Sequence, residues 1–171
     1  QKGLLETARA LAALNRPDVL FLIVGDFPKD QEALKTELQR IEGLALRFIG
    51  DQPFEQIPDI IACADICVLL QDPGSLVARF QTPAKLSDAL AMGLTVLAEP
   101  TPALADLAER KAFTPITRTT LVAELGKALN TDLSRPAAHP AYTEMLSHAA
   151  NRRILQGLMR ATGPAELSPA L

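Results

Sequence analysis

The chain has 171 residues, of which 48% are apolar, and a net charge of −3. This is the size of one domain, with enough apolar side chains for a substantial core. Aromatic residues make up only 4%, Trp is absent and no basic stretch occurs, so the composition argues against a nucleic-acid-binding surface. No apolar run reaches the roughly 20 residues that span a bilayer, and no signal-peptide pattern opens the chain.

Helical and strand-like patterns alternate along the chain. Continuous apolar runs predict strands buried on both faces, and periodic segments between them predict helices. In chain order we expect a helix at Leu4–Leu14, a strand at Val19–Val24, a helix at Gln31–Arg40, a strand at Ala45–Ile49, a short helix at Phe54–Ala62 bent at Pro58, a strand at Ile66–Leu70, a helix after Pro83, a strand at Thr95–Ala98, a helix at Ala103–Arg110, a weak strand at Ala112–Ile116 and a helix at Thr120–Leu129. This order predicts an α/β fold with a Rossmann-like, doubly wound parallel sheet.

We expect residues 1–130 to form this α/β domain. Residues 131–162 are expected to cross the surface and end in a helix over Thr143–Arg160, and residues 163–171 to be a frayed tail. A doubly wound domain normally opens on a strand in the middle of its sheet, whereas this chain opens on a helix. The pattern therefore favours a piece of a longer chain whose first strand lies upstream, and leaves open a domain that starts with a helix.

Ligands of open parallel sheets bind outside the carboxyl ends of the strands, so candidate residues come from the segments that follow them. Gly25 and Asp26 follow one expected strand, and Gly50 and Asp51 follow the next. Carboxylates there could bind a metal or ligand hydroxyl groups, but aspartate is also common at caps and turns. The longest such segment, Gln71–Thr82, includes Gly74 and is the strongest candidate for a functional loop.

The helix after this segment combines a cap with an unusual charge pattern. We expect Thr82 to be its N-cap and Pro83 its first residue, which places Lys85 at the third position. A lysine is mildly unfavourable there because of the helix dipole, but with free backbone amides it makes an anion site. Asp88 lies three residues later on the same face. The pair either binds a ligand or forms an ordinary surface salt bridge, and spacing alone leaves both open.

Other reactive residues form no recognisable set. Cys63 and Cys67 are expected to be buried, reduced thiols, and His139 and His148 to be surface residues. No metal-ligand pattern, dinucleotide fingerprint, P-loop or nucleophile elbow occurs.

Several stretches together resemble a known family. They are Lys2-Gly3 before the first helix, "LIVGD", "RFIGD", "ADICVLL" and "TPAKLSDALAMGLTVLA". Over residues 2–129 the chain resembles the C-terminal, nucleotide-sugar-binding domain of retaining glycosyltransferases with the GT-B architecture (group 1, family 4-like). The resemblance implies a hexosyltransferase-type enzyme that takes a UDP- or GDP-sugar and needs no metal or other cofactor. It also implies an acceptor-binding N-terminal domain in the same longer chain, without which this part is inactive. Such an enzyme is cytoplasmic, and any peripheral attachment to the inner membrane would belong to the other domain.

The resemblance also assigns roles to residues. Lys85 and Lys2 would act catalytically by stabilising the leaving diphosphate, together with backbone amides near Lys85 and Leu86. Asp88 would bind the ribose hydroxyls. The remaining substrate-binding candidates are Gly25, Asp26, Gly50 and Asp51 for the base, and Gly74, Phe80, Thr82 and Pro83 around the sugar and diphosphate.

Two positions depart from the family pattern. Phe80 stands where the family has the first of two acids, and Phe27 stands where it has a glycine, so that we expect its ring to crowd a ligand. These departures leave a non-catalytic GT-B-like binding module as an alternative to a divergent transferase. A related sugar-nucleotide epimerase or a phosphorylase is a further alternative, although the additional acids, histidines or cofactor lysine that these need are not found.

Overall fold

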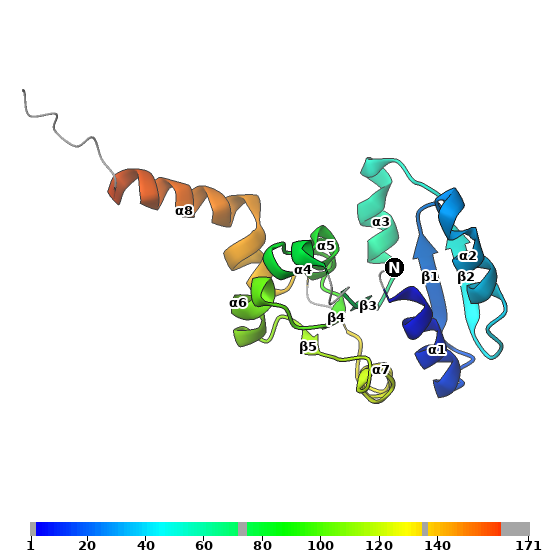
Figure 1. The fold of residues 1–171 in the computed structure, drawn as a ribbon. Helices are drawn as coiled ribbons and strands as arrows, with labels where there is room; N and C mark the ends of the chain where they lie inside the picture. Colours follow the sequence, from blue (N-terminus) through cyan, green and yellow to red (C-terminus); the bar gives the residue numbers. More distant parts are fainter. Residues whose placement is uncertain (1–2, 72–74, 135–136, 162–171) are drawn as a thin grey trace, which may run out of the picture.

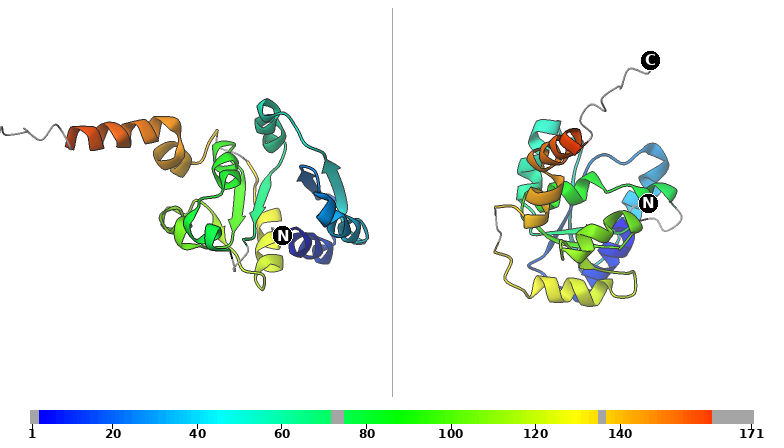
Figure 2. Two further views of the ribbon diagram at one scale, coloured as in Figure 1. Left: turned by 45° about the horizontal axis from the view of Figure 1, so that its top comes forward. Right: turned by 90° about the vertical axis from the view of Figure 1, so that its left-hand side faces the viewer.

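The computed structural model describes residues 3–71, 75–134 and 137–161 (Figure 1). Strands β1 (Leu20–Val24) and β2 (Ala45–Ile49) pair in parallel, and β3 (Ile66–Leu69), β4 (Thr95–Ala98) and β5 (Thr114–Pro115) form a second parallel group in that order. Helices connect the strands and cover them on both sides (Figure 2). The predicted α/β class with a doubly wound parallel sheet is confirmed.

The α-helices are α1 (Leu4–Leu14), α2 (Glu32–Gln39), α3 (Ile57–Ala62), α4 (Leu76–Phe80), α5 (Ala84–Ala91), α6 (Ala105–Glu109), α7 (Leu121–Leu129) and α8 (His148–Ala161). Short 3-10 turns precede three of them, namely η1 (Lys29–Gln31), η2 (Phe54–Gln56) and η3 (Pro102–Leu104), and a π-helical turn, η4 (Tyr142–Leu146), lies before α8. Helix α8 extends away from the rest of the molecule (Figure 1).

Successive residues of β3 and β4 point to opposite sides of the sheet and build two cores. Ile66 and Val68 of β3, with Leu97 of β4, pack under α1 and α7. On the other side, Cys67 and Leu69 pack against α5 and α6. A third core joins α1 and α2 to β1 and β2. This alternation explains why the strands read as continuous apolar runs, since both faces are covered.

Helix α1 connects the two groups of strands. Ala8 belongs to the core over β1 and β2, and Ala10 and Leu11 belong to the core of the other group. The helix begins beside the carboxyl end of β3, where Gly3 has φ 66° and an added Cβ would lie 2.3 Å from the Leu70 Cβ. Only glycine meets both requirements at this position. The orders β2-β1 and β3-β4-β5 match the two flanks of a doubly wound sheet.

Several expected boundaries were wrong. The segment Gln71–Thr82 is not a continuous loop, because Leu76–Phe80 forms α4 with Ser75 as its N-cap. Pro58 does not bend a helix but lies in the first turn of α3. The weak strand shrinks to Thr114–Pro115, and the last helix is broken at Ser147, which has an extended backbone. The expected tail at 163–171 lies outside the described residues.

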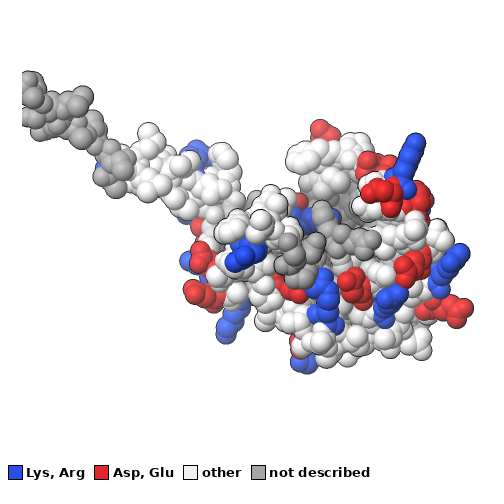
Figure 3. Space-filling model, in the orientation of Figure 1, with Lys and Arg blue, Asp and Glu red and all other residues white. Residues whose placement is uncertain are grey.

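The cysteine prediction was partly wrong. Cys63 is exposed at the end of α3, where its thiol donates to the Asp59 carbonyl at 3.3 Å, whereas Cys67 is half-buried. Acidic and basic side chains are interspersed over the face shown in Figure 3. Within the described residues, no helix is both long and apolar enough to cross a membrane.

Candidate functional site

The candidate site is the amino end of α5, which follows the carboxyl end of β3. Its N-cap is Pro83, in an extended conformation, and Ala84 is its first residue. The Thr82 hydroxyl does not cap the helix but donates to the carbonyl of Ala103, in the middle of η3, at 3.5 Å. Lys85 is therefore the second helical residue and not the third. The amide of Ala84 is still one that no carbonyl of its own helix can reach, as an anion site requires.

Lys85 and Asp88 form no salt bridge with each other, although they are three residues apart on α5. Asp88 is half-buried, and burial raises the pKa of its carboxyl group. The thiol of Cys67 on β3 lies close enough to be affected by both charges, although burial is the main cause that raises its pKa to about 11. The surface salt bridge that spacing left open is thus excluded, and the Asp88 carboxylate is held partly desolvated beside the sheet.

Leu86 cannot contribute as predicted. Its side chain is completely buried in the core, and its backbone amide already donates to the Pro83 carbonyl at 3.0 Å. The amides that remain for an anion are those earlier in the first turn.

The loops after β1 and β2 lie side by side. The Asp26 amide donates to the Asp51 carboxylate at 2.9 Å, and the Gly25 amide donates to the Ile49 carbonyl at 2.9 Å. Gly25 has φ 110°, which requires glycine, and a Cβ on Gly50 would lie 3.0 Å from the Asp26 carboxylate. The sequence prediction that these four residues gather at one edge of the sheet agrees with this geometry.

Phe27 does not crowd this edge as we expected. Its ring packs edge-on against Phe48 with centroids 5.5 Å apart, inside the core between α2 and β2. The family's glycine position is filled here by an aromatic ring that turns away from the loop.

A polar network at the same edge was not found from the sequence. Arg118, after β5, donates to both carboxylate oxygens of Glu99 at 3.0 and 3.2 Å and to the Gln71 carbonyl at 3.0 Å. The Gln71 amide donates to Glu99 at 3.1 Å. Arg118 also reaches Glu6 of α1 at 3.4 Å. These three partners of Arg118 lie 19, 47 and 112 residues away along the chain, so no local spacing could have indicated them.

Comparison with protein families finds one match, the family described as glycosyl transferases group 1, over residues 1–131. The chain belongs to the group 1 glycosyltransferases. Among solved structures, this glycosyltransferase domain is similar to the crystal structure of Anabaena Alr3699/HepE in complex with UDP-glucose, with a TM-score of 0.67 and 21% identity. The match covers 93% of this chain and 45% of that chain, so the domain spans less than half of the length of HepE. A comparison with curated proteins finds no significant match.

Phe80, at the position of the family's first acid, lies on the surface of the glycosyltransferase domain. Phe80 is the last residue of α4 and is 79% exposed, with the Arg79 guanidinium 5.8 Å from its ring centre. Lys2 and Gly74 lie outside the described residues. In the described ranges, no group of three or more histidine, cysteine or acidic residues could hold a metal ion.

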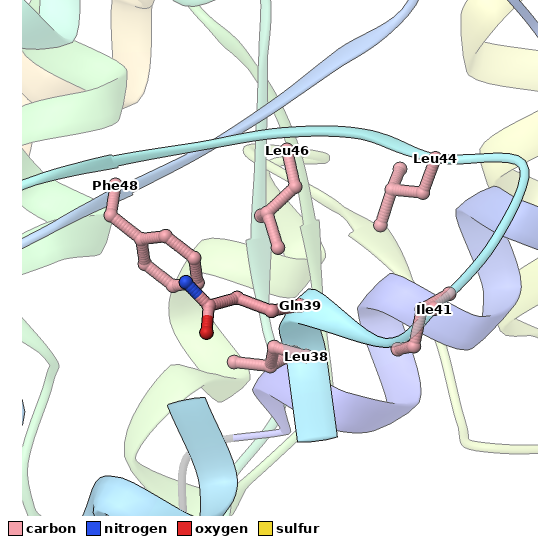
Figure 4. A pocket seen from close by; sticks show the side chains of 6 residues that line it. All are labelled: Leu38, Gln39, Ile41, Leu44, Leu46 and Phe48. Carbon is pink, nitrogen blue, oxygen red and sulfur yellow. The ribbon is translucent and has the colours of Figure 1, made fainter. Parts of the chain in front are cut away.

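One concavity in the described part of the glycosyltransferase domain has no chemistry for a nucleotide diphosphate. It measures about 380 Å³ and lies between α2 and β2, lined by Leu38, Gln39, Ile41, Leu44, Leu46 and Phe48 (Figure 4). No charged side chain lines it. A smaller one, of about 250 Å³, lies at the carboxyl ends of β3 and β4, beside the polar network.

Proposed function

We propose that this domain binds the nucleotide-sugar donor of a retaining glycosyltransferase, with the diphosphate over the amino end of α5. The observation that carries the proposal is the arrangement of Lys85 in the first turn and the half-buried Asp88 carboxylate one turn later, with no salt bridge between them. A carboxylate that has no ion pair or hydrogen bond within the described residues is suited to accept hydrogen bonds from a ribose, and a cation beside helix amides is suited to a diphosphate. That HepE was solved with UDP-glucose supports a UDP-sugar over a GDP-sugar.

The protein's contribution to the reaction is positioning and charge stabilisation. As the glycosyl group leaves, negative charge grows on the nucleoside diphosphate, and Lys85 together with Lys2 would stabilise it without a metal. The paired loops with Asp26 and Asp51 would contact the base. Thr82 and Pro83 would hold the start of α5 in place, and Gly74 and Phe80 would face the sugar.

We further propose that one more strand completes the sheet of this domain. We also propose that the longer protein has an N-terminal, acceptor-binding domain. Two observations support the strand. β1 and β3 each have one edge without a partner strand among the described residues, and Gly3 brings the start of α1 to the carboxyl end of β3. A parallel strand between β1 and β3 would give the order of a doubly wound sheet and lead into α1 as every other strand leads into its helix. On this proposal the domain binds a hexosyl donor but transfers nothing alone, and the two free cysteines agree with a cytoplasmic enzyme.

A non-catalytic binding module is the second candidate, because Phe80 takes the place of the family's first acid. Both candidates bind nucleotide, but only the transferase turns it over when the second domain is present. Product analysis of a protein that contains both domains separates them.

The donor proposal is tested by titrating the 171-residue chain with UDP and GDP and following backbone amide shifts. Shifts concentrated in residues 82–88 at millimolar nucleotide are expected. If neither nucleotide perturbs this segment, the domain does not bind a donor at α5.

A further inference from the structure

Helix α8 presents an exposed apolar face. It projects from the rest of the molecule in Figures 1 and 2, and every residue from 151 to 160 is exposed. Four of these residues are large and apolar and are 54–73% exposed: Ile154, Leu155, Leu158 and Met159. At about 100° per residue they fall within an arc of about 140° around the helix axis. These four side chains therefore form one continuous apolar stripe along α8.

The apolar stripe is expected to lie against another surface. Of the described side chains of α8, only that of Ala150 is buried. A helix of 14 residues is marginal in water by itself, and helices in proteins are stabilised mainly by packing an apolar face. Gly157, in the middle of α8, has a low helix propensity and weakens the helix further. A partner that covers the stripe would supply the missing stability.

The charge of α8 indicates an anionic partner. Residues 148–161 contain Arg152, Arg153 and Arg160 and no acidic residue, although the whole chain has a net charge of −3. At the same angle per residue, Arg153 and Arg160 lie opposite the apolar stripe, and Arg152 lies at its border beside Met159. An apolar face opposite a purely basic one is typical of helices that lie in the plane of a membrane surface.

The position of the arginines favours a lipid surface over a protein groove. A groove that covered the stripe would leave Arg153 and Arg160 in water, where an ion pair contributes little. An anionic lipid surface instead attracts every basic side chain within a Debye length. The long arginine stems can also reach the lipid phosphates while the helix lies at the depth of the headgroups.

We propose that α8 binds an anionic lipid surface, with the apolar stripe at the boundary of headgroups and acyl chains and the three arginines at the phosphates. This is attachment to one leaflet and not a span. It places a membrane contact in this domain, whereas the family resemblance assigns any such contact to the other domain. The proposal concerns a different part of the molecule from α5 and does not depend on the donor proposal.

The test is binding of the 171-residue chain to vesicles in a flotation assay. Vesicles of phosphatidylcholine alone are compared with vesicles of phosphatidylcholine and phosphatidylglycerol in equal parts. The chain should bind the anionic vesicles and not the neutral ones, and added salt should release it, because salt screens the attraction. Amide hydrogen exchange in residues 151–160 should slow on the anionic vesicles, since the helix then packs against lipid.

Two pairs of variants assign the contact to α8. R152Q/R160Q should weaken binding to the anionic vesicles about 20- to 30-fold, because each arginine near such a surface contributes about fivefold. The matched control is R40Q/R47Q, which removes two exposed arginines at the end of α2 and on β2 and should leave binding unchanged.

L155Q should weaken binding about 10-fold or more, because it removes a side chain from the apolar stripe. Its control, V122Q, changes a 40% exposed position on α7 and should leave binding unchanged. All of these variants alter exposed side chains, so their Tm values should stay close to that of the unmodified chain.

The proposal is overturned if the chain does not bind the anionic vesicles, or if R40Q/R47Q weakens binding as much as R152Q/R160Q does. The rival occupant of the stripe is a protein surface, above all the proposed N-terminal domain. If a protein with both domains shows slow exchange in residues 151–160 without vesicles and does not bind them, that domain covers the stripe and the proposal is wrong. None of these results affects the donor proposal, which the nucleotide titration tests separately.

Discussion

Replacing Asp88 by asparagine separates a ligand role from a structural one, because the two predict opposite signs. The carboxylate is half-buried on α5 and has no ion pair or hydrogen bond within the described residues. A hydrogen bond from a ribose hydroxyl to a charged acceptor contributes about 1.5–3 kcal/mol. D88N should therefore weaken UDP or GDP binding about 10- to 150-fold, measured by calorimetric titration at pH 7.

The thermal stability of D88N should not fall with its nucleotide affinity. Burial raises the pKa of Asp88 in the folded state, so the fold disfavours the ionised form relative to the unfolded chain. This penalty is fully present above the raised pKa and vanishes below the ordinary pKa of aspartate. At pH 7, D88N should therefore unfold at the same temperature or higher, and the gain should disappear as the pH falls through this range. Thermal unfolding at several pH values measures it.

The matched control is D59N, on the exposed surface of α3, which should change neither the nucleotide affinity nor the Tm at pH 7. Unchanged nucleotide binding in D88N together with a lower Tm would refute the reasoning. Asp88 would then support the fold, and the amino end of α5 would lose its ribose contact.

Three further predictions follow from single contacts. K85M should weaken UDP about 10-fold or more but leave uridine binding unchanged in the same titration, because the lysine acts on the diphosphate; an equal loss for uridine would contradict this. E99A removes the partner of Arg118 and of the Gln71 amide and should cost about 1–3 kcal/mol, a fall in Tm of about 2–10 °C, whereas E109A on the surface of α6 should be neutral. G3A should destabilise the fold by about 1–3 kcal/mol because the added Cβ would collide with Leu70. G157A is the control: an added Cβ there would have no atom within 4 Å, and the substitution should stabilise α8 by about 0.5–1 kcal/mol. Equal Tm values for the two variants would show that Gly3 is not closely packed.

The local pattern of apolar residues was sufficient to predict the helices and strands whose residues pack into continuous cores. The helix Leu4–Leu14 and the strands Ala45–Ile49 and Thr95–Ala98 have the expected bounds to the residue. Helix α4 was missed because its five residues, LVARF, are too few to show a helical period, and because its N-cap Ser75 stands in a segment that reads as loop. The interruption at Ser147 was missed for a related reason, since apolar residues continue on both sides of it.

The candidate site could likewise be predicted from the sequence only in part. Lys85 and Asp88 could be found because their relation is internal to one helix. Their exact positions could not, because the Thr82 hydroxyl leaves the cap to reach Ala103, a contact with a segment 21 residues away. The shift of one position does not weaken the hypothesis: Lys85 stays in the first turn, and its spacing to Asp88 is unchanged.

The Glu99–Arg118 network marks the limit of reasoning from local sequence patterns. Each of its residues follows a different strand, where a charged side chain in isolation reads as a turn residue. Together they hold both main-chain groups of Gln71, the second residue after β3. No motif in the sequence describes this contact, because the Gln71 carbonyl is held by an arginine 47 residues further along the chain.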